Sequence, residues 1–248
     1  MTALAPSTPL NLHALPADVW HAHTLARGQL PVRASGHAAL DAQLPGGGWP
    51  LGALTEILQP AGVHSEWRLL LPALVHSGPG PVLLVGAPHL PFAPALAAQG
   101  LDAQRLIWVQ APGAQARLWA TEQALRCAEV AAVLAWLPTA RSEQLRRLQM
   151  AAADYSKLLF VMRPSGAQQE ASPAALRLQV EPQAAAAPVS LTAAAGPQPP
   201  AHGLQVHVLK RRGPPLAHPL QLPARSARLN LLLASSQAHA LDCRTYRA

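Results

Sequence analysis

The chain has 248 residues, half of them hydrophobic, and a formal charge of +7, which fits one α/β domain with extensions. No apolar run reaches the roughly 18 residues of a membrane-spanning helix, and the first residues lack the basic and apolar regions of a signal peptide, so we expect a cytoplasmic protein without membrane contact. Seven of the basic side chains and only one acid lie in residues 201–248, which makes the C-terminal region a candidate contact for DNA or for an acidic protein surface.

The composition divides the chain into three parts. Residues 1–30 are rich in proline and alanine and are expected to form an extension with one short helix over residues 16–27. Residues 31–222 form the predicted core domain, in which an Ala/Pro-rich stretch at about residues 182–203 reads as a long loop. Residues 223–248 are a basic tail whose structure the sequence leaves open.

Strand and helix patterns alternate along the core. Because the strands are continuously apolar, the pattern predicts a mostly parallel sheet that helices cover on both faces. A further strand at residues 204–210 alternates between apolar and polar side chains, and residues 220–222 are expected to return antiparallel to it after a turn. The other strands are expected at residues 53–58, 81–85, 105–110, 130–137, 157–162 and 176–180, and the helices at residues 65–75, 92–99, 115–128 and 142–153.

The loop after the first of these strands lies where a P-loop would bind phosphate. A working P-loop reads GxxxxGK[ST], with glycines that free the backbone, a lysine for the phosphates and a hydroxyl for magnesium. The eight residues here read QPAGVHSE. Gln59 and His64 replace the glycines, Ser65 the lysine and Glu66 the hydroxyl residue, while Gly62 is out of register. Glu66 would repel phosphate. The loop alone leaves open a degenerate nucleotide site or an ordinary turn.

The residues before this loop resemble the start of the RecA-type recombinase core. Gly36, Leu40 and Asp41 match a Gly-x-x-x-Leu-Asp segment, residues 47–52 match a Gly-Gly-x-Pro-x-Gly turn, and the strand ends in Glu56-Ile57. The resemblance implies a RecA-like α/β core, with a mostly parallel twisted sheet flanked by helices and a degenerate P-loop.

The catalytic residues of that core are missing. RecA-like ATPases carry a glutamate after the strand at residues 81–85, where this chain reads GAPH, and an aspartate at the place of Ala135 or Trp136. Gln110 does match a residue type common in the core. Because phosphoryl transfer depends on positioning and electrostatic stabilisation, the joint loss of lysine, magnesium ligands and base predicts no ATPase activity.

A RecA-like core with a degenerate P-loop resembles ImuA, an accessory family of translesion DNA synthesis, and SulA, a family of cell-division inhibitors. Residues 141–164 resemble both, with Arg146 and Arg147 expected to point outward from a helix whose Leu145, Leu148 and Ala152 face the sheet. The likeness covers roughly residues 31–222. It implies a non-catalytic role in SOS-induced mutagenic repair, in contact with the Y-family polymerase-like protein ImuB, an error-prone replicative-type polymerase and, as a further candidate, RecA.

A basic turn in residues 204–220 also resembles RecA. Two RecA lysines, one residue apart, reach the ATP of a neighbouring protomer, and Lys210 and Arg212 fall at those places with Arg211 between them. The resemblance implies that Lys210 and Arg212 offer a pair of positive charges to a partner protomer, while this chain brings no nucleotide itself. An exposed basic turn without a partner explains the same residues.

Cysteines and histidines show no metal-ligand spacing. Cys127 and Cys243 stand far apart, which fits a reducing compartment. The closest histidine pair, His21 and His23, has no cysteine or carboxylate support and is more typical of a surface than of a metal site. We predict no metal and no cofactor.

Three other functions remain open at this point. A SulA-like inhibitor would bind the tubulin-like division protein, although the strand and basic turn after residue 200 have no role in it. An active recombinase-type ATPase is contradicted by the loop at residues 59–66. A DNA-binding module carried by the basic tail would show affinity that falls steeply with salt.

Overall fold

The computed structural model describes residues 30–183 and 203–223, together with residue 231. The short helix expected over residues 16–27, most of the predicted loop at residues 182–203 and nearly all of the basic tail lie outside this range. His21, His23 and Cys243 lie outside it as well.

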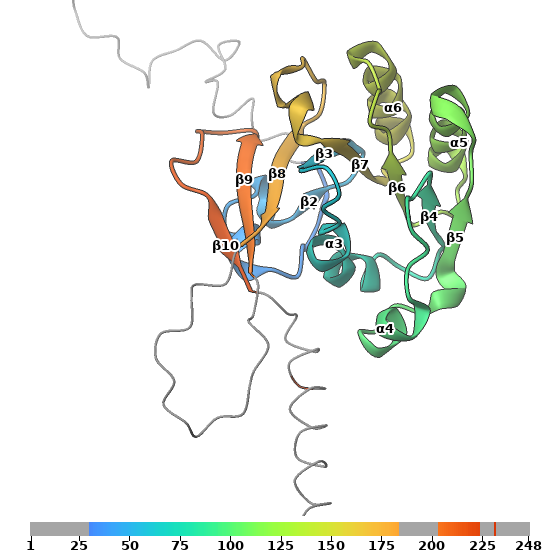
Figure 1. Ribbon diagram of the computed structural model, residues 1–248, viewed down its shortest axis with the longest axis horizontal. Coiled ribbons are helices and arrows are strands. Elements are labelled where there is room, and N and C mark those ends of the chain that lie inside the picture. Colours follow the sequence, from blue (N-terminus) through green and yellow to red (C-terminus); the bar gives the residue numbers. More distant parts are fainter. Residues whose placement is uncertain (1–29, 184–202, 224–230, 232–248) are drawn as a thin grey trace, which may run out of the picture.

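One eight-stranded sheet organises the described chain, in the order β10-β9-β8-β3-β7-β6-β4-β5 (Figure 1). The strands β3 to β8 run parallel to one another, β9 is antiparallel to β8, and β10 is antiparallel to β9. The expected α/β class with a mostly parallel sheet is therefore confirmed. The strands are β3 (Ala53–Gln59), β4 (Val82–Val85), β5 (Leu106–Val109), β6 (Ala132–Trp136), β7 (Leu158–Pro164), β8 (Leu176–Pro182), β9 (Leu204–Lys210) and β10 (Leu220–Leu222).

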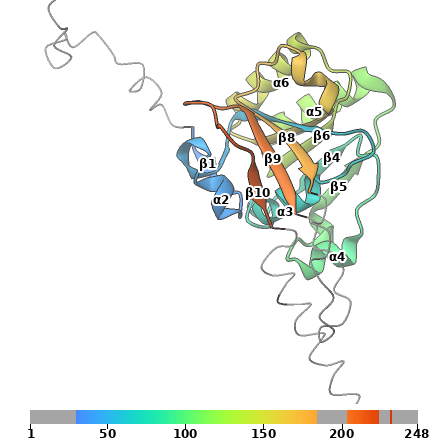
Figure 2. The same ribbon diagram turned by 60° about the vertical axis from the view of Figure 1, so that its left-hand side comes forward.

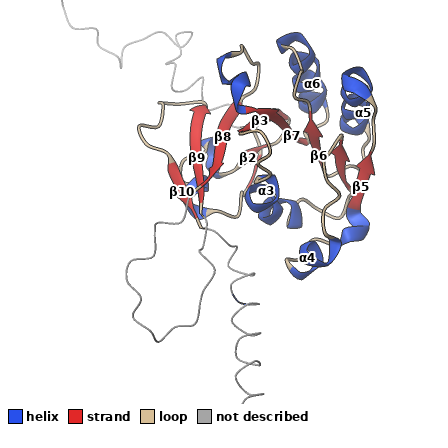
Figure 3. Ribbon diagram, viewed as in Figure 1, coloured by secondary structure: helices blue, strands red, loops and turns tan. Residues whose placement is uncertain are grey.

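Helices cover the two faces of the sheet (Figure 3). Leu69 and Leu96, from the helices α3 and α4, belong to one buried cluster, and Leu125 and Leu148, from α5 and α6, belong to a second cluster across the sheet. These helices are α3 (Glu66–Val75), α4 (Ala93–Ala98), α5 (Gly113–Arg126) and α6 (Ser142–Asp154). Their starts and ends differ from the predicted ones by at most two residues.

Short elements not predicted from the sequence precede β3. The strands β1 (Val32–Arg33) and β2 (Trp49–Pro50) pair with each other, and the single-turn helix α2 (Ala38–Asp41) lies next to β10 (Figure 2). Short 3-10 helices also occur at η1 (Pro45–Gly47), η2 (Ala103–Arg105) and η3 (Ser165–Gln169).

One expectation about the sheet is wrong. The apolar run at residues 105–110 was expected to be covered on both faces, but β5 is the outermost strand, and its Ile107 and Trp108 are 46% and 37% exposed. An apolar run of four residues has the same pattern at the centre and at the edge of a sheet, because strand order depends on distant segments. The alternating strand β9 does behave as expected, since Leu204 and Val206 are buried and Gln205 is not.

The segment before α3 explains why the first motif contains its particular residues. Gly36 has a φ of +81°, and a Cβ there would lie 2.3 Å from the Cβ of Pro72 in α3, so a side chain is excluded. Asp41 accepts a hydrogen bond from the Ser35 backbone N–H at 2.8 Å. The imidazole of His37 donates to the carbonyl of Leu69 at 3.1 Å. The neighbouring carbonyl of Arg68 is the one that Pro72 leaves without its helical donor.

A buried ion cluster joins the three central strands β8, β3 and β7. Glu56 of β3 contacts Arg163 of β7 at 2.8 Å and Arg177 of β8 at 2.6 Å. Arg163 also reaches Glu170 at 2.6 Å, and Arg177 donates to the carbonyl of Ala167 in η3 at 2.8 Å. Burial opposes the charge of Arg163, but hydrogen bonds to the two glutamates outweigh it and raise the pKa of the guanidinium.

The cluster gives a prediction about stability. Glu56→Gln keeps the shape of the side chain but leaves two buried guanidinium groups without their shared charge, so we expect the free energy of unfolding in urea to fall by about 3–5 kcal/mol. Glu170→Gln removes the half-exposed partner, for which we expect a loss of about 1 kcal/mol or less. Equal losses in the two variants would contradict the central role of Glu56.

His37 gives a prediction about pH. Burial lowers its pKa from the usual 6.5, despite hydrogen bonds to the carbonyls of Leu69 and Arg68. Below a pH of about 6.5 the unfolded chain therefore takes up the proton before the folded chain does, and stability decreases as the pH falls toward the folded-state pKa. We expect His37→Gln to show a shallower decrease than the wild type in urea denaturation between about pH 7 and pH 5.

The comparison variant for this measurement is His76→Gln, which removes an exposed histidine at the end of the same helix α3. If both variants flatten the pH dependence equally, the decrease does not come from burial of His37.

Candidate functional site

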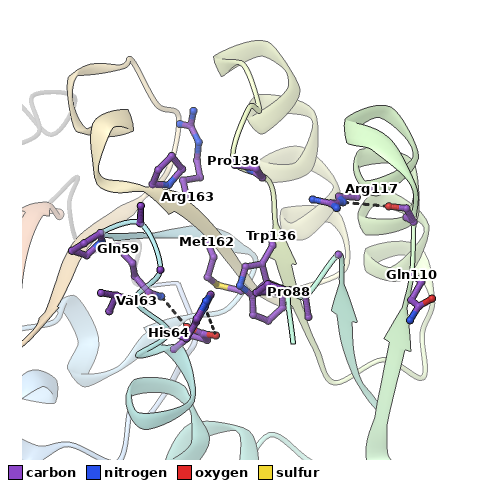
Figure 4. Close-up of a pocket in the computed structure, with 18 of the residues that line it drawn as sticks. Gln59, Val63, His64, Pro88, Gln110, Arg117, Trp136, Pro138, Met162 and Arg163 are labelled. Carbon is purple, nitrogen blue, oxygen red and sulfur yellow. Dashed lines mark hydrogen bonds and ion pairs between the residues drawn. The ribbon is translucent and has the colours of Figure 1, made fainter. Parts of the chain in front are cut away.

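A cleft of about 800 Å³ opens at the carboxyl ends of the parallel strands. Its lining comes from the residues that end or follow β3, β4, β5, β6 and β7 (Figure 4). The helices α3 and α4, which follow β3 and β4, pack on one face of the sheet, whereas α5 and α6, which follow β5 and β6, pack on the other. The loops after the neighbouring strands β4 and β6 therefore diverge. In open α/β sheets, ligands bind at such a point, outside the carboxyl ends of the strands. We take this cleft as the candidate functional site.

The predicted degenerate loop forms one wall of the cleft, and its polar side chains bind one another. Gln59 accepts from the backbone N–H of Ser65 at 2.9 Å and donates to the carboxylate of Glu66 at 3.2 Å. Gln59, Ser65 and Glu66 are 6%, 4% and 3% exposed. His64 lies with its Nδ1 3.7 Å from the same carboxylate, and its ring meets that of His89 edge-on at 4.8 Å. Gly62 lies exposed in the loop.

The position of Glu66 decides what the loop can bind. It is the first residue of α3, where free backbone N–H groups and the helix dipole attract a negative charge. In a phosphate-binding loop that charge comes from the ligand. Here the chain's own buried carboxylate lies in the first turn of the helix, and the amide of Gln59 donates to it. The arrangement therefore stabilises the loop and disfavours an external phosphate.

The remaining walls are mostly apolar. Trp136 ends β6 and lines the cleft, whereas its neighbour Ala135 is buried on the opposite face under α5 and α6. Trp136 therefore occupies the place at which the RecA resemblance implies an aspartate. Trp108 and Met162 line the cleft beside it, and Gln110 lies at the end of β5. The apolar wall also contains five prolines, which are Pro60, Pro88, Pro112, Pro138 and Pro164.

Arg117 of α5 is a cleft residue that the sequence motifs missed. Its Nε donates to the carbonyl of Ala111 at 3.2 Å. Gly86, with a φ of +68°, leaves room for the arginine stem, because a Cβ there would lie 2.7 Å from Cδ of Arg117. The available signal was its place among Thr121, Ala124 and Leu125 on the buried face of the helix.

The basic turn lies at the opposite end of the sheet. Lys210 ends β9 and pairs in register with Arg177, near the amino end of β8, whereas the cleft lies at the carboxyl ends. Lys210 donates to the carbonyl of Ser172 at 3.0 Å, and Arg211 donates to the carbonyls of Pro214 and Gln43. Arg212 follows as an exposed residue. The structure thus brings the loop residues together at the cleft and keeps the turn away from them.

The predicted faces of α6 are confirmed, since Leu145, Leu148 and Ala152 are buried and Arg146 and Arg147 are exposed. Among the described residues, no group of three His, Cys, Asp or Glu side chains is placed to hold a metal ion. In the same part of the chain, no helix is long and apolar enough to cross a membrane.

Comparison with known proteins yields no assignment. The chain matches no protein-family model, and no curated protein matches it significantly.

The loop gives a prediction about anion binding. Glu66→Ala removes the carboxylate from the first turn of α3, so the turn becomes open to an external anion. We expect the variant to lose about 1 kcal/mol of stability, because Gln59 loses its acceptor. We also expect inorganic pyrophosphate at constant ionic strength to raise its Tm by on the order of 2 °C more than that of the wild type.

The matched control is Glu143→Ala, which removes an exposed carboxylate from the first turn of α6. If pyrophosphate raises the Tm of both variants equally in thermal unfolding, Glu66 does not occupy an anion site.

Proposed function

We propose that the chain is a non-catalytic accessory protein of SOS-induced mutagenic translesion DNA synthesis, similar to ImuA and built on a RecA-like core. It acts in the cytoplasm through contacts with a Y-family polymerase-like partner of the ImuB type, an error-prone replicative-type polymerase and RecA. It neither binds nor hydrolyses ATP.

The observation that carries this proposal is the buried carboxylate of Glu66 at the start of α3. A strand–loop–helix unit at the carboxyl edge of a parallel sheet is the place for a phosphate, yet this one holds its own anion, hydrogen-bonded to Gln59. Trp136 and the lining residues after β4, which are Gly86, Ala87 and Pro88, supply no carboxylate to the cleft as magnesium ligand or as base. With binding groups and catalytic groups both missing, the proposed role is recognition of a protein and not phosphoryl transfer.

The positions that carry the RecA resemblance support the fold. Gly36 and Leu40 lie against the buried core, and Asp41 closes the loop before it. Trp49, in the glycine-rich turn, is fully buried and meets Phe160 edge-on at 5.3 Å. These positions are structural, and the missing ones are those that would contact nucleotide. A relative of an ATPase that has become an accessory protein is expected to keep the residues of the core and to lose those that bind and hydrolyse nucleotide.

The location of the basic turn supports contact with a partner. A basic side chain that contacts the nucleotide of a neighbouring protomer has to lie away from the cleft of its own chain. Lys210 and Arg212 lie at the amino end of the strands, away from the cleft, and Lys210 is exposed. Arg211 instead ties the turn to the segment before η1 through the carbonyl of Gln43.

Co-purification tests the proposal most directly. The tagged full chain would be recovered from cells treated with a DNA-damaging agent, and bound proteins identified by mass spectrometry. We expect a Y-family polymerase-like protein or RecA. Recovery of the tubulin-like division protein with neither of these would replace the proposal with a SulA-like function.

A charge reversal tests the turn. Lys210→Glu with Arg212→Glu is expected to abolish RecA association in a pull-down while the chain remains folded, since Arg211 and its contact with Gln43 are left intact. Thermal unfolding of the variant checks that the loss of the Lys210 hydrogen bond to Ser172 does not unfold the chain. The comparison variant is Arg146→Glu with Arg147→Glu, which changes the charge equally on the exposed face of α6. Unchanged binding in the first variant, or equal loss in both, would rule out the turn as the RecA contact.

A further inference from the structure

We propose that the cleft binds an acidic apolar segment of a partner protein. An acidic side chain of that segment pairs with Arg117, and its aromatic or aliphatic side chains pack against Trp136 and Met162. The inference rests on the proposed function only in taking the occupant to be a protein.

Arg117 is held in position for such a pair. The carbonyl of Ala111 fixes its Nε, and Gly86 accommodates its stem. In the described part of the chain, its two terminal nitrogens have no hydrogen-bond or ion-pair partner, although the residue lines the cleft. Figure 4 shows the guanidinium extending from α5 toward Pro138. A guanidinium fixed in this way presents paired donors that match the geometry of a carboxylate.

The charges around the cleft determine where an acidic group of the ligand can lie. The two terminal nitrogens of Arg163, the other arginine in the lining, are paired with Glu56 and Glu170, so Arg117 is the arginine of the cleft that can pair with an anion of the ligand. Glu66 carries a negative charge at the loop wall. An acidic group is therefore favoured at Arg117 and disfavoured near α3, which also excludes a polyphosphate chain extended across the cleft.

The walls between these charges require an apolar ligand. Trp136, Met162, Trp108 and the five prolines offer contact area but few hydrogen-bond donors, because proline has no N–H. Tryptophan, methionine and arginine are the residue types enriched where proteins bind one another.

The apolar surface also extends beyond the cleft, and this favours a protein over a small molecule. Pro88 lines the cleft, and Leu90 and Phe92, which follow it in the loop to α4, are 67% and 73% exposed. Trp108, at the outer strand, is 37% exposed. An apolar surface that continues from a cleft onto a neighbouring loop and strand is typical of a protein-binding site.

The test begins with a random peptide library displayed on phage and selected on the full-length chain. We expect enriched peptides to carry an acidic residue within a few positions of aromatic or aliphatic ones. A parallel selection on Arg117→Met, which keeps the stem against Gly86, is expected to retain the apolar residues and lose the acidic one. Failure to enrich any peptide, or the same acidic preference with Arg117→Met, would overturn the proposal.

Exchanging the charges of Arg117 and of the acidic peptide residue then tests whether the two form an ion pair. Fluorescence polarisation with the best synthetic peptide should show about tenfold or greater weakening for Arg117→Glu and recovery when the peptide's acid becomes lysine. The control is Arg126→Glu, on the exposed face of the same helix, which should leave affinity unchanged. Equal weakening in both variants, absence of recovery, or displacement of the peptide by ATP or by self-association of the chain would each contradict the assignment.

This result is independent of the co-purification above. Peptide binding that depends on Arg117 would stand even if the cellular partner is not a translesion polymerase or RecA. Conversely, recovery of those partners with an intact complex in Arg117→Glu would place their contact elsewhere and refute the cleft as the binding site.

Discussion

The fold depends on the burial of one carboxylate between two guanidinium groups. Glu56 lies in the central strand β3 and is fully buried, with Arg163 on one neighbouring strand and Arg177 on the other. The connection from β7 back to β8 crosses this region in residues 165–175, with the short helix η3 in place of a full helix. It offers few apolar side chains to cover the sheet. The arginine stems and the ion pairs fill the space instead, and a slip in strand register would leave these charges unpaired.

That constraint positions the cleft. The strands β3 and β7, which Glu56 and Arg163 join, end in Gln59 and Pro164 at its lining. Once these ends are fixed, the character of the cleft depends on the side chains that follow them. Glu66 puts a carboxylate at the start of α3, and Trp136, Trp108 and Met162 make the rest of the lining mostly apolar.

Local pattern predicted most of the elements, since apolar runs and helical periodicity depend on neighbouring residues. The alternation in β9 correctly placed Leu204 and Val206 inside. Pattern did not give the edge position of β5, because that depends on which strands pair across the sheet. It also did not give the partners of Glu56, which lie more than one hundred residues away in the chain. In the site, the loop at residues 59–66 was found from its motif positions, whereas Arg117 belongs to no motif and reaches the cleft only through the packing of α5.

The cleft and the basic turn belong to different strands of the sheet, since β3 to β7 supply the cleft and the turn follows β9. The cleft opens at the carboxyl ends, and the turn with Lys210 extends from the amino end of β8. A ligand seated against Trp136 therefore leaves the turn accessible, and a partner at the turn leaves the cleft open. An ATPase couples such ends through nucleotide-dependent movement. Under the proposed function, in which Glu66 stands in place of a phosphate, the sheet between them undergoes no such movement. Two partners bound at its ends would be held at a fixed separation, and that geometry requires no chemistry from the chain that holds them.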